Sequence, residues 1–198
     1  MTSPRNIFPI PPPPLPEGKR TATLVQDPMP PVVTEVGPAG AFLVELLIYN
    51  GSPFKDHWAY WVSSHTARNL GVKIHATGDV RNGFRFECKR HISLHDADER
   101  PTTRVPLQWV DGRHFDERAM FNSGSCTIDN TPACGFETSA HKVKVPGKTL
   151  NAVDDGSRPG KKVALRDCQT WIVESAAQLV EDGIFSEEVA AYLHAIRQ

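Results

Sequence analysis

The sequence has no excess of either charge. It carries 22 lysine and arginine residues against 23 aspartate and glutamate residues, which gives a formal net charge of −1. Proteins that bind nucleic acid through its phosphates carry a clear basic excess, and a polybasic membrane anchor needs a cluster of lysine and arginine. We therefore expect neither a nucleic acid nor an anionic membrane surface as a partner.

The sequence also lacks a long hydrophobic run. Residues 41–49 (AFLVELLIY) are strongly apolar, but Glu45 interrupts them, and a membrane span needs about 20 such residues. Near the N-terminus, the segment IFPIPPPPLP cannot form the apolar helix of a signal peptide, because proline breaks helices. The expected location is the cytoplasm, with no membrane span.

Cysteine is sparse, with four residues and no Cys-x-x-Cys spacing. Neither a zinc knuckle nor a dithiol redox motif is therefore indicated. Cytoplasmic thiols are normally reduced. Cys126 and Cys134 lie in one stretch rich in glycine, serine and threonine, and the sequence leaves open whether they pair or stay free.

Proline is unevenly distributed, since 11 of the 17 prolines lie in residues 1–38. This leader favours extended polyproline II structure and has no core period. Its main interpretation is a disordered tail, and the alternatives are a docking strand or a ligand for a proline-binding partner. The remaining residues, 39–198, have the length of a single domain, which we expect to be one α+β unit.

Five segments have the composition of β-strands. Residues 41–49 form an apolar run that stops at Asn-Gly, and 58–64 are aromatic and β-branched. Residues 72–78 and 83–90 alternate between apolar and polar side chains, and 104–110 form a fifth candidate. The spacing predicts an antiparallel meander.

The rest of the domain divides into a loop-rich part and a helical part. Residues 111–162 are predicted to be a loop-rich insertion with one helical turn at 115–121. After it, Asp167 is a good N-cap for a helix that ends near Gly183. Ser186 caps a second helix. The predicted architecture is therefore an antiparallel sheet followed by a C-terminal helix pair.

Cys168 is singled out by its position, one residue after the predicted N-cap. Free N–H groups and the helix dipole favour a thiolate there, and the same groups can stabilise an oxyanion. This makes Cys168 a candidate nucleophile. The alternative is that Cys168 is a small, inert apolar residue between helix and sheet.

A nucleophilic thiol needs a base, and His57 and His75 lie on neighbouring predicted strands. If these strands pair, the two imidazoles can lie close together on one face of the sheet. One ring would then accept the thiol proton and the other would orient it. A zinc site is the competing interpretation, and it would need a third ligand such as Cys168 or an acid. We expect no cofactor.

The segments HWAYWV, KIHATG and DCQTWIV, in this order, resemble the motifs of permuted papain-like thiol enzymes. These include the lecithin:retinol acyltransferase-like and NlpC-like proteins, in which the histidine strands precede the cysteine helix. More narrowly, these segments and the C-terminal helices resemble a set of small fungal proteins. The resemblance covers roughly residues 42–95 and 163–198.

The resemblance implies that Cys168 is the nucleophile, His57 the base and His75 the third polar group. We expect Trp58, Trp171 and Gln169 to line the substrate cleft. For at least two of Trp58, Trp61 and Trp171 the main interpretation is core packing, because residues 58 and 61 cannot point to the same face of a strand. The predicted function is a cysteine-dependent hydrolase or acyltransferase that acts on an amide or ester of a small molecule or peptide through an acyl-enzyme. The alternative is a non-catalytic binding or accessory protein on the same fold.

Overall fold

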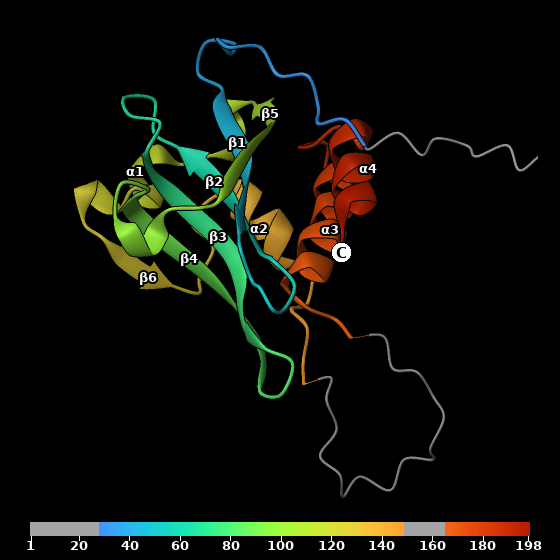
Figure 1. The fold of residues 1–198 in the computed structure, drawn as a ribbon. Helices are drawn as coiled ribbons and strands as arrows, with labels where there is room; N and C mark the ends of the chain where they lie inside the picture. The colour runs from blue at the N-terminus through green and yellow to red at the C-terminus, as the bar shows by residue number, and fades with distance from the viewer. Residues whose placement is uncertain (1–27, 149–164) are drawn as a thin grey trace, which may run out of the picture.

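The computed structural model describes residues 28–148 and 165–198. They form a mixed α+β fold, in which helices pack against a six-stranded antiparallel sheet (Figure 1). No helix in this described part of the chain is long and apolar enough to cross a membrane.

The sheet has the strand order β5-β1-β2-β3-β4-β6. The strands span β1 Phe42–Tyr49, β2 His57–Ser63, β3 Leu70–Asp79, β4 Gly83–Ser93, β5 Thr103–Val110 and β6 Thr127–Asp129. The first four follow one another as the predicted meander. All five strands predicted from the sequence are present.

The prediction of a continuous meander is wrong at β5, which crosses back to pair with β1. The reason lies in β1, whose first six residues are all buried. A strand that is apolar on both faces belongs in the interior of a sheet, and it needs a partner along each edge. β5 supplies the second partner, so β1 becomes an inner strand.

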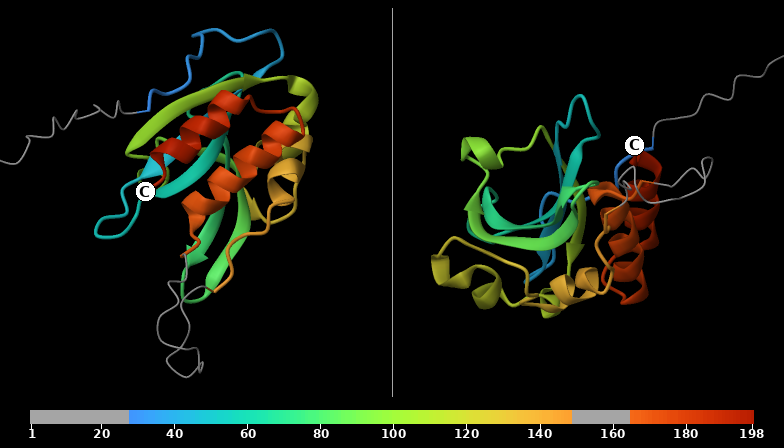
Figure 2. Two further views of the ribbon diagram at one scale, coloured as in Figure 1. Left: turned by 90° about the vertical axis from the view of Figure 1, so that its right-hand side faces the viewer. Right: turned by 90° about the horizontal axis from the view of Figure 1, so that it is seen from below.

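The helical segments all come after β4, and β5 and β6 lie between them in the chain. They are η1 Ala97–Glu99, η2 Gly112–His114, α1 Glu117–Met120, η3 Asn122–Gly124, α2 Gly135–His141, α3 Cys168–Glu181 and α4 Glu187–Ile196. The predicted helix pair α3 and α4 lies along the outside of the curved sheet (Figure 2). Asp167 caps α3 within a capping box, and Ser186 caps α4. Gly183 follows α3 with a φ of +70°, as a helix C-terminus requires.

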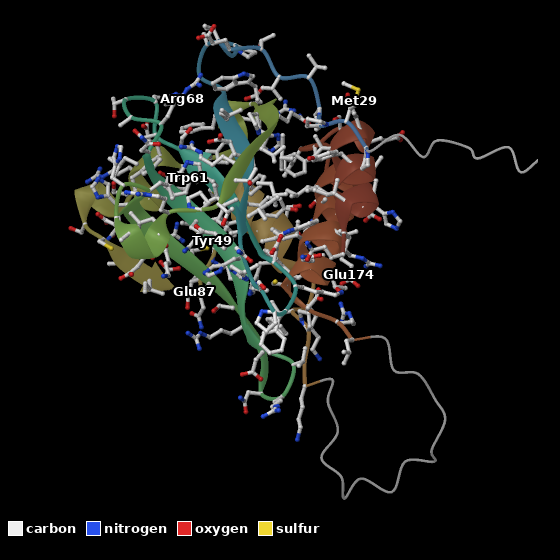
Figure 3. The ribbon with its side chains drawn as sticks, in the orientation of Figure 1. Met29, Tyr49, Trp61, Arg68, Glu87 and Glu174 are labelled. Carbon is white, nitrogen blue, oxygen red and sulfur yellow. The ribbon has the colours of Figure 1, made fainter. Side chains whose placement is uncertain are left out.

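The two faces of the sheet have different surroundings, and β2 shows this best. Trp58 and Tyr60 point to the helices and join the main hydrophobic cluster. Ala59 and Trp61 point the opposite way, as alternation along a strand demands. They form a small second cluster with Leu47, Ile92 and Leu94. In Figure 3, Tyr49, Trp61 and Glu87 lie over the strands, whereas Glu174 lies on the helical side.

The described part of the proline-rich leader is docked on the domain. The indole N–H of Trp109 donates to the carbonyl oxygen of Thr34 at 2.9 Å, and Arg68 donates to the carbonyl oxygen of Glu35 at 2.8 Å. In this stretch, side chains of the domain therefore bind the main chain of the leader. Residues 1–27 lie outside the described residues.

The predicted insertion contributes to the core in its described part. Helix α2 buries Phe136 completely, and the buried Glu137 carboxylate binds Arg90 of β4 at 2.8 Å. The prediction of loops is wrong here because α2 is short and polar in composition, so its apolar face is not evident in the sequence. Cys126 and Cys134 are both free. Residues 149–162 lie outside the described residues.

Candidate active site

Strands β2 and β3 separate at the end that carries His57. Their ladder runs from Ser63–Gly71 to Tyr60–Ile74 and ends there. Main-chain groups of successive strand residues point to alternate edges. The Asp56 carbonyl oxygen accepts from a side chain outside the sheet, so by this alternation Asp56 and Trp58 present their carbonyl and N–H groups on the open side, away from β1.

The N-terminus of α3 occupies this open edge. The Cys168 thiol donates to the carbonyl oxygen of Asp56 at 4.0 Å, and the Gln169 side-chain amide donates to the same oxygen at 2.9 Å. A hydrogen bond from the Trp58 main chain lowers the pKa of the Cys168 thiol, against the larger effect of burial. The sulfur therefore lies beside the residues that flank His57, more than 100 positions earlier in the chain.

The two predicted histidines meet across the gap between the strands. Nε2 of His57 lies 2.8 Å from Nδ1 of His75, and Nε2 of His75 lies 3.2 Å from Oε1 of Glu87. A carboxylate can only accept a hydrogen bond, so His75 carries its proton on Nε2. His57 must then donate from Nε2 to His75. This leaves Nδ1 of His57 unprotonated and available as a base.

Both imidazoles are neutral at physiological pH. Burial, and then the positive charges of Lys73 and Lys89, lower the pKa of His57 from 6.5 to about 4. Burial is also the largest effect on His75, followed by His57 itself, and its pKa falls to about 2. Neutral rings are required for the proton positions derived above, because a charged ring would have no acceptor nitrogen.

A cavity of about 300 Å³ opens beside the histidine pair on the face away from the helices. It is lined by Tyr49, His57, Lys73, His75, Thr77, Gly78 and Asp98. Glu99 holds one wall in place, since one of its oxygens binds Lys73 and the other binds Lys89 at 2.7 Å. The basic nitrogen of His57 thus belongs to a residue that lines a space large enough for a small ligand.

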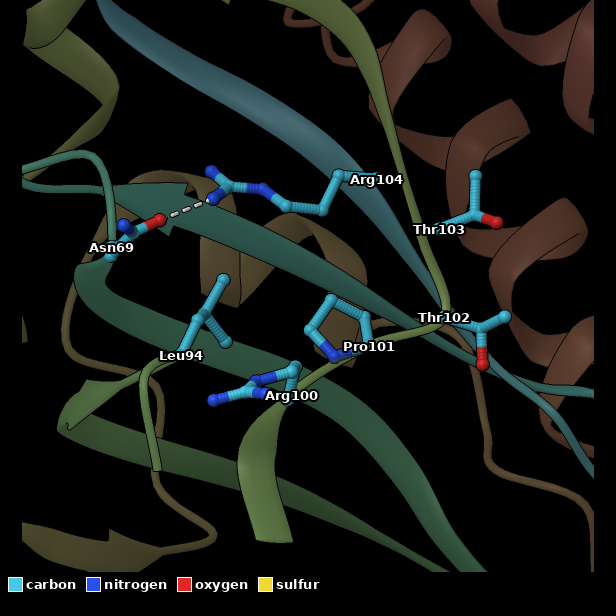
Figure 4. A pocket seen from close by; sticks show the side chains of 7 residues that line it. All are labelled: Asn69, Leu94, Arg100, Pro101, Thr102, Thr103 and Arg104. Carbon is cyan, nitrogen blue, oxygen red and sulfur yellow. Dashed lines mark hydrogen bonds between the residues drawn. The ribbon is translucent and has the colours of Figure 1, made fainter. Parts of the chain in front are cut away.

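A second cavity of about 330 Å³ lies elsewhere on the molecule (Figure 4). It is lined by Asn69, Leu94, Arg100, Pro101, Thr102, Thr103 and Arg104. Arg104 donates to Asn69 at 2.6 Å and also binds Glu45. None of the residues predicted as site residues lines this cavity.

Cys168 is not activated in this resting arrangement. Its residue is 8% exposed, and burial raises the pKa of its thiol, so the thiol is protonated at neutral pH. Within the described residues, the sulfur has no hydrogen bond to His57. The structure therefore brings Cys168 to the strand that carries the base, while the contact between sulfur and imidazole is not formed.

The residues predicted to line a substrate cleft are buried. Trp58 is 2% exposed, and Trp171 and Gln169 are fully buried. Trp171 donates its indole N–H to Val143 at 3.2 Å, and Gln169 binds the Asp56 main chain. None of the three is open to solvent in this arrangement, because α3 presents Trp171 and Gln169 to the sheet and β2 presents Trp58 to the helices.

The sequence analysis did not single out Glu87, the carboxylate that fixes the proton on His75. A signal for it exists. His75 and Glu87 lie on polar positions of two alternating strands, and the β3–β4 hairpin register pairs them directly. Across the described residues there is no group of three or more histidine, cysteine, aspartate or glutamate residues placed to hold a metal ion.

Comparison with known proteins gives one result. Residues 44–186 match the model of a family of unknown function, DUF6540. No curated protein and no solved structure matches the chain. The matched region contains His57, His75, Glu87 and Cys168. Because it spans more than half of the sequence, the chain belongs to the DUF6540 family.

Proposed function

We propose that the protein is a cysteine-dependent hydrolase or acyltransferase acting on an amide or ester, with the arrangement of a permuted papain-like enzyme. Cys168 is the nucleophile, His57 the base and His75 the residue that orients it. The observation that carries the proposal is the 2.8 Å bond between His57 and His75. This bond, together with the contact between His75 and Glu87, leaves Nδ1 of His57 unprotonated on the strand that borders the Cys168 thiol.

The chemistry follows from these positions. Nδ1 of His57 accepts the thiol proton as the sulfur attacks the carbonyl carbon of the substrate, and His57 then gives the proton to the leaving alcohol or amine. The resulting thioester on Cys168 passes its acyl group to water or another acceptor. Hydrogen bonds from the main chain of Trp58, Gln169 and Cys168 lower the thiol pKa, and such N–H groups also suit an oxyanion.

Activation requires a rearrangement at the open edge of β2, because Cys168 and His57 share no hydrogen bond in the resting arrangement. Substrate binding must bring the imidazole and the thiol into contact and favour ionisation of the thiol over its buried neutral form. Catalytic hydrogen bonds are often long in the absence of substrate and tighten in the complex. The side chains of Cys168 and His57 are the two that must move.

The test is mass spectrometry after incubation with a panel of acyl and peptidyl p-nitrophenyl esters. Because Cys126 is exposed, the protein should carry Cys126→Ser to remove a competing thiol. We expect an acyl adduct on Cys168, its loss in Cys168→Ser, and slower formation in His57→Gln. Absence of an adduct with every ester, in a folded protein, contradicts the proposal.

A second candidate is a non-catalytic binding protein, and the buried, protonated thiol favours it. In that case the cavity beside His57 takes a small ligand without covalent chemistry. Ligand binding would then shift the NMR signals of His57 and His75 equally in the natural protein and in Cys168→Ser, with no adduct at any time. A covalent adduct on Cys168 decides against this candidate.

A further inference from the structure

Gln198 is bound along the same open edge of β2 as Cys168. Its carboxamide oxygen accepts from the main-chain N–H of Asp56 at 3.0 Å and from the side chain of Gln169 at 3.1 Å. Its carboxamide nitrogen donates to the Asp56 carboxylate at 3.1 Å. Both the oxygen and the nitrogen of the Gln198 carboxamide are therefore hydrogen-bonded.

The main chain of Gln198 is held as well. Its N–H donates to Oε1 of Gln169 at 3.0 Å, and its carbonyl oxygen accepts from Nζ of Lys55 at 2.6 Å. Lys55 also pairs with Asp167, the N-cap of α3, at 3.2 Å. A single residue thus contacts both the segment that leads into β2 and the first turn of α3.

The pattern of donors and acceptors selects a carboxamide. Gln169 is completely buried, and the Asp56 carbonyl accepts one of its amide hydrogens, so the group that faces Gln198 is a donor. The Asp56 carboxylate accepts from the carboxamide nitrogen of Gln198. A glutamate in place of the glutamine would set two carboxylates against each other, because an ionised carboxylate has no hydrogen to donate.

The recognising residues are sequence neighbours of the proposed catalytic residues. Asp56 precedes His57, and Gln169 follows Cys168. The Asp56 main chain is shared, since its carbonyl lies 4.0 Å from the Cys168 sulfur while its N–H binds the Gln198 carboxamide. Gln198 itself is exposed whereas Gln169 is buried, so the bound side chain can be exchanged while its receptor stays fixed.

We propose that Asp56, Gln169 and Lys55 form a subsite for a glutaminyl residue, which Gln198 occupies in cis and which a peptide substrate occupies when Gln198 withdraws. This inference rests on the proposed function and names its substrate class as a peptide that presents glutamine. Gln198 then acts as an internal competitor of the substrate.

The experiment uses a peptide that copies residues 196–198, acetyl-Ile-Arg-Gln-N-methylamide, and its counterpart ending in glutamate. Binding is measured by NMR titration of the full chain carrying Gln198→Ala. The matched control is Arg197→Ala, which removes an exposed neighbour and leaves Gln198 in place. We expect Gln198→Ala to bind the glutamine peptide at least tenfold more tightly than Arg197→Ala does, and at least tenfold more tightly than it binds the glutamate peptide.

Equal binding of the glutamine peptide to both variants, or equal binding of both peptides to Gln198→Ala, overturns the inference and leaves Gln198 as an anchor of α4. This result is separate from a failure of the proposed function. A Cys168 adduct without selective peptide binding retains the thiol chemistry and removes the subsite. Selective peptide binding without an adduct supports the subsite and contradicts the chemistry.

Discussion

The two faces of the sheet differ in what they bury. The outer face packs against α3 and α4 through large apolar side chains, with Trp58, Tyr60 and Trp171 at 2% exposure or less. The inner face has only a small apolar cluster and buries titratable side chains instead, including Lys73, Glu87 and the neutral His75. Apolar burial drives folding, whereas buried titratable groups mark functional sites. The comparison places the larger apolar core on the outer face and the buried titratable groups, the proposed base among them, on the inner one.

The largest expected effect tests the outer face. Trp171→Ala removes a fully buried indole, and such truncations cost about 3–5 kcal/mol. Urea unfolding should show a loss of this size in the free energy of unfolding. The inner-face variant His75→Gln should lose clearly less. An equal loss of unfolding free energy in Trp171→Ala and His75→Gln would contradict the view that the outer face carries most of the stability.

The next effect concerns the inner face and the proposed chemistry. Glu87→Gln keeps the size of the side chain but replaces an obligate acceptor by a group that can also donate. The proton on His75 Nε2 is then no longer fixed, so Nδ1 of His57 loses its assigned role as base. Acylation of Cys168 should slow by a factor of the order of 100, measured by mass spectrometry over time. An unchanged rate of Cys168 acylation, in a variant that unfolds like the natural protein, would contradict the proposed role of Glu87 and His75 in orienting His57.

The stability of the protein should fall on acidification through the histidine pair. The folded-state pKa of His57 is about 4 against 6.5 for the free group, so between these values the unfolded chain binds a proton that the folded protein does not. The free energy of unfolding therefore decreases as the pH falls from 6.5 towards 4. His57 alone should contribute roughly 1–3 kcal/mol.

Urea unfolding of the natural protein and of His57→Gln at several pH values measures this contribution. The variant should lose part of the pH dependence between 6.5 and 4, because glutamine does not titrate. Parallel pH curves for the two proteins would show that His57 takes up its proton as readily in the folded state as in the unfolded state.

The smallest effect sharpens the comparison, because it concerns a polar group on the apolar face. The Tyr60 hydroxyl donates to the carbonyl oxygen of Ile172 at 2.8 Å and lies 3.1 Å from the hydroxyl of Ser175. Tyr60→Phe should cost about 1 kcal/mol in urea unfolding. Tyr192→Phe on α4 is the matched control, with little expected change because this tyrosine is only partly buried.

Local signals in the sequence predicted much of the fold. The strands follow from apolar runs and alternation, and the helix ends follow from Asp167, Gly183 and Ser186, whose roles depend on near neighbours in the chain. The meeting of His57 with His75 was also predictable, because it needs only that two consecutive strands pair. The α+β architecture is confirmed on this basis.

The remainder depends on contacts between distant segments. The return of β5 to β1, the burial of α2 and the docking of residues near Thr34 are each decided by surfaces that form only when the sheet is complete. The burial of Cys168 has the same origin. The exposure of its side chain depends on how α3 packs against β2, and not only on its position after the N-cap. The contact between Glu87 and His75 is intermediate between local and long-range signals. It can be predicted from the register of the β3–β4 hairpin once the turn between these strands has been located.

The unbonded indole of Trp58 gives the protein a built-in spectroscopic probe. All four tryptophans are among the described residues, and three of them donate to carbonyl oxygens, Trp61 to Arg68, Trp109 to Thr34 and Trp171 to Val143. Within residues 28–148 and 165–198, the buried N–H of Trp58 has no acceptor. Its proton resonance should therefore stand apart from the other three. Because Trp58 follows His57 directly, this one signal should report, without any label, when the open end of β2 receives a ligand.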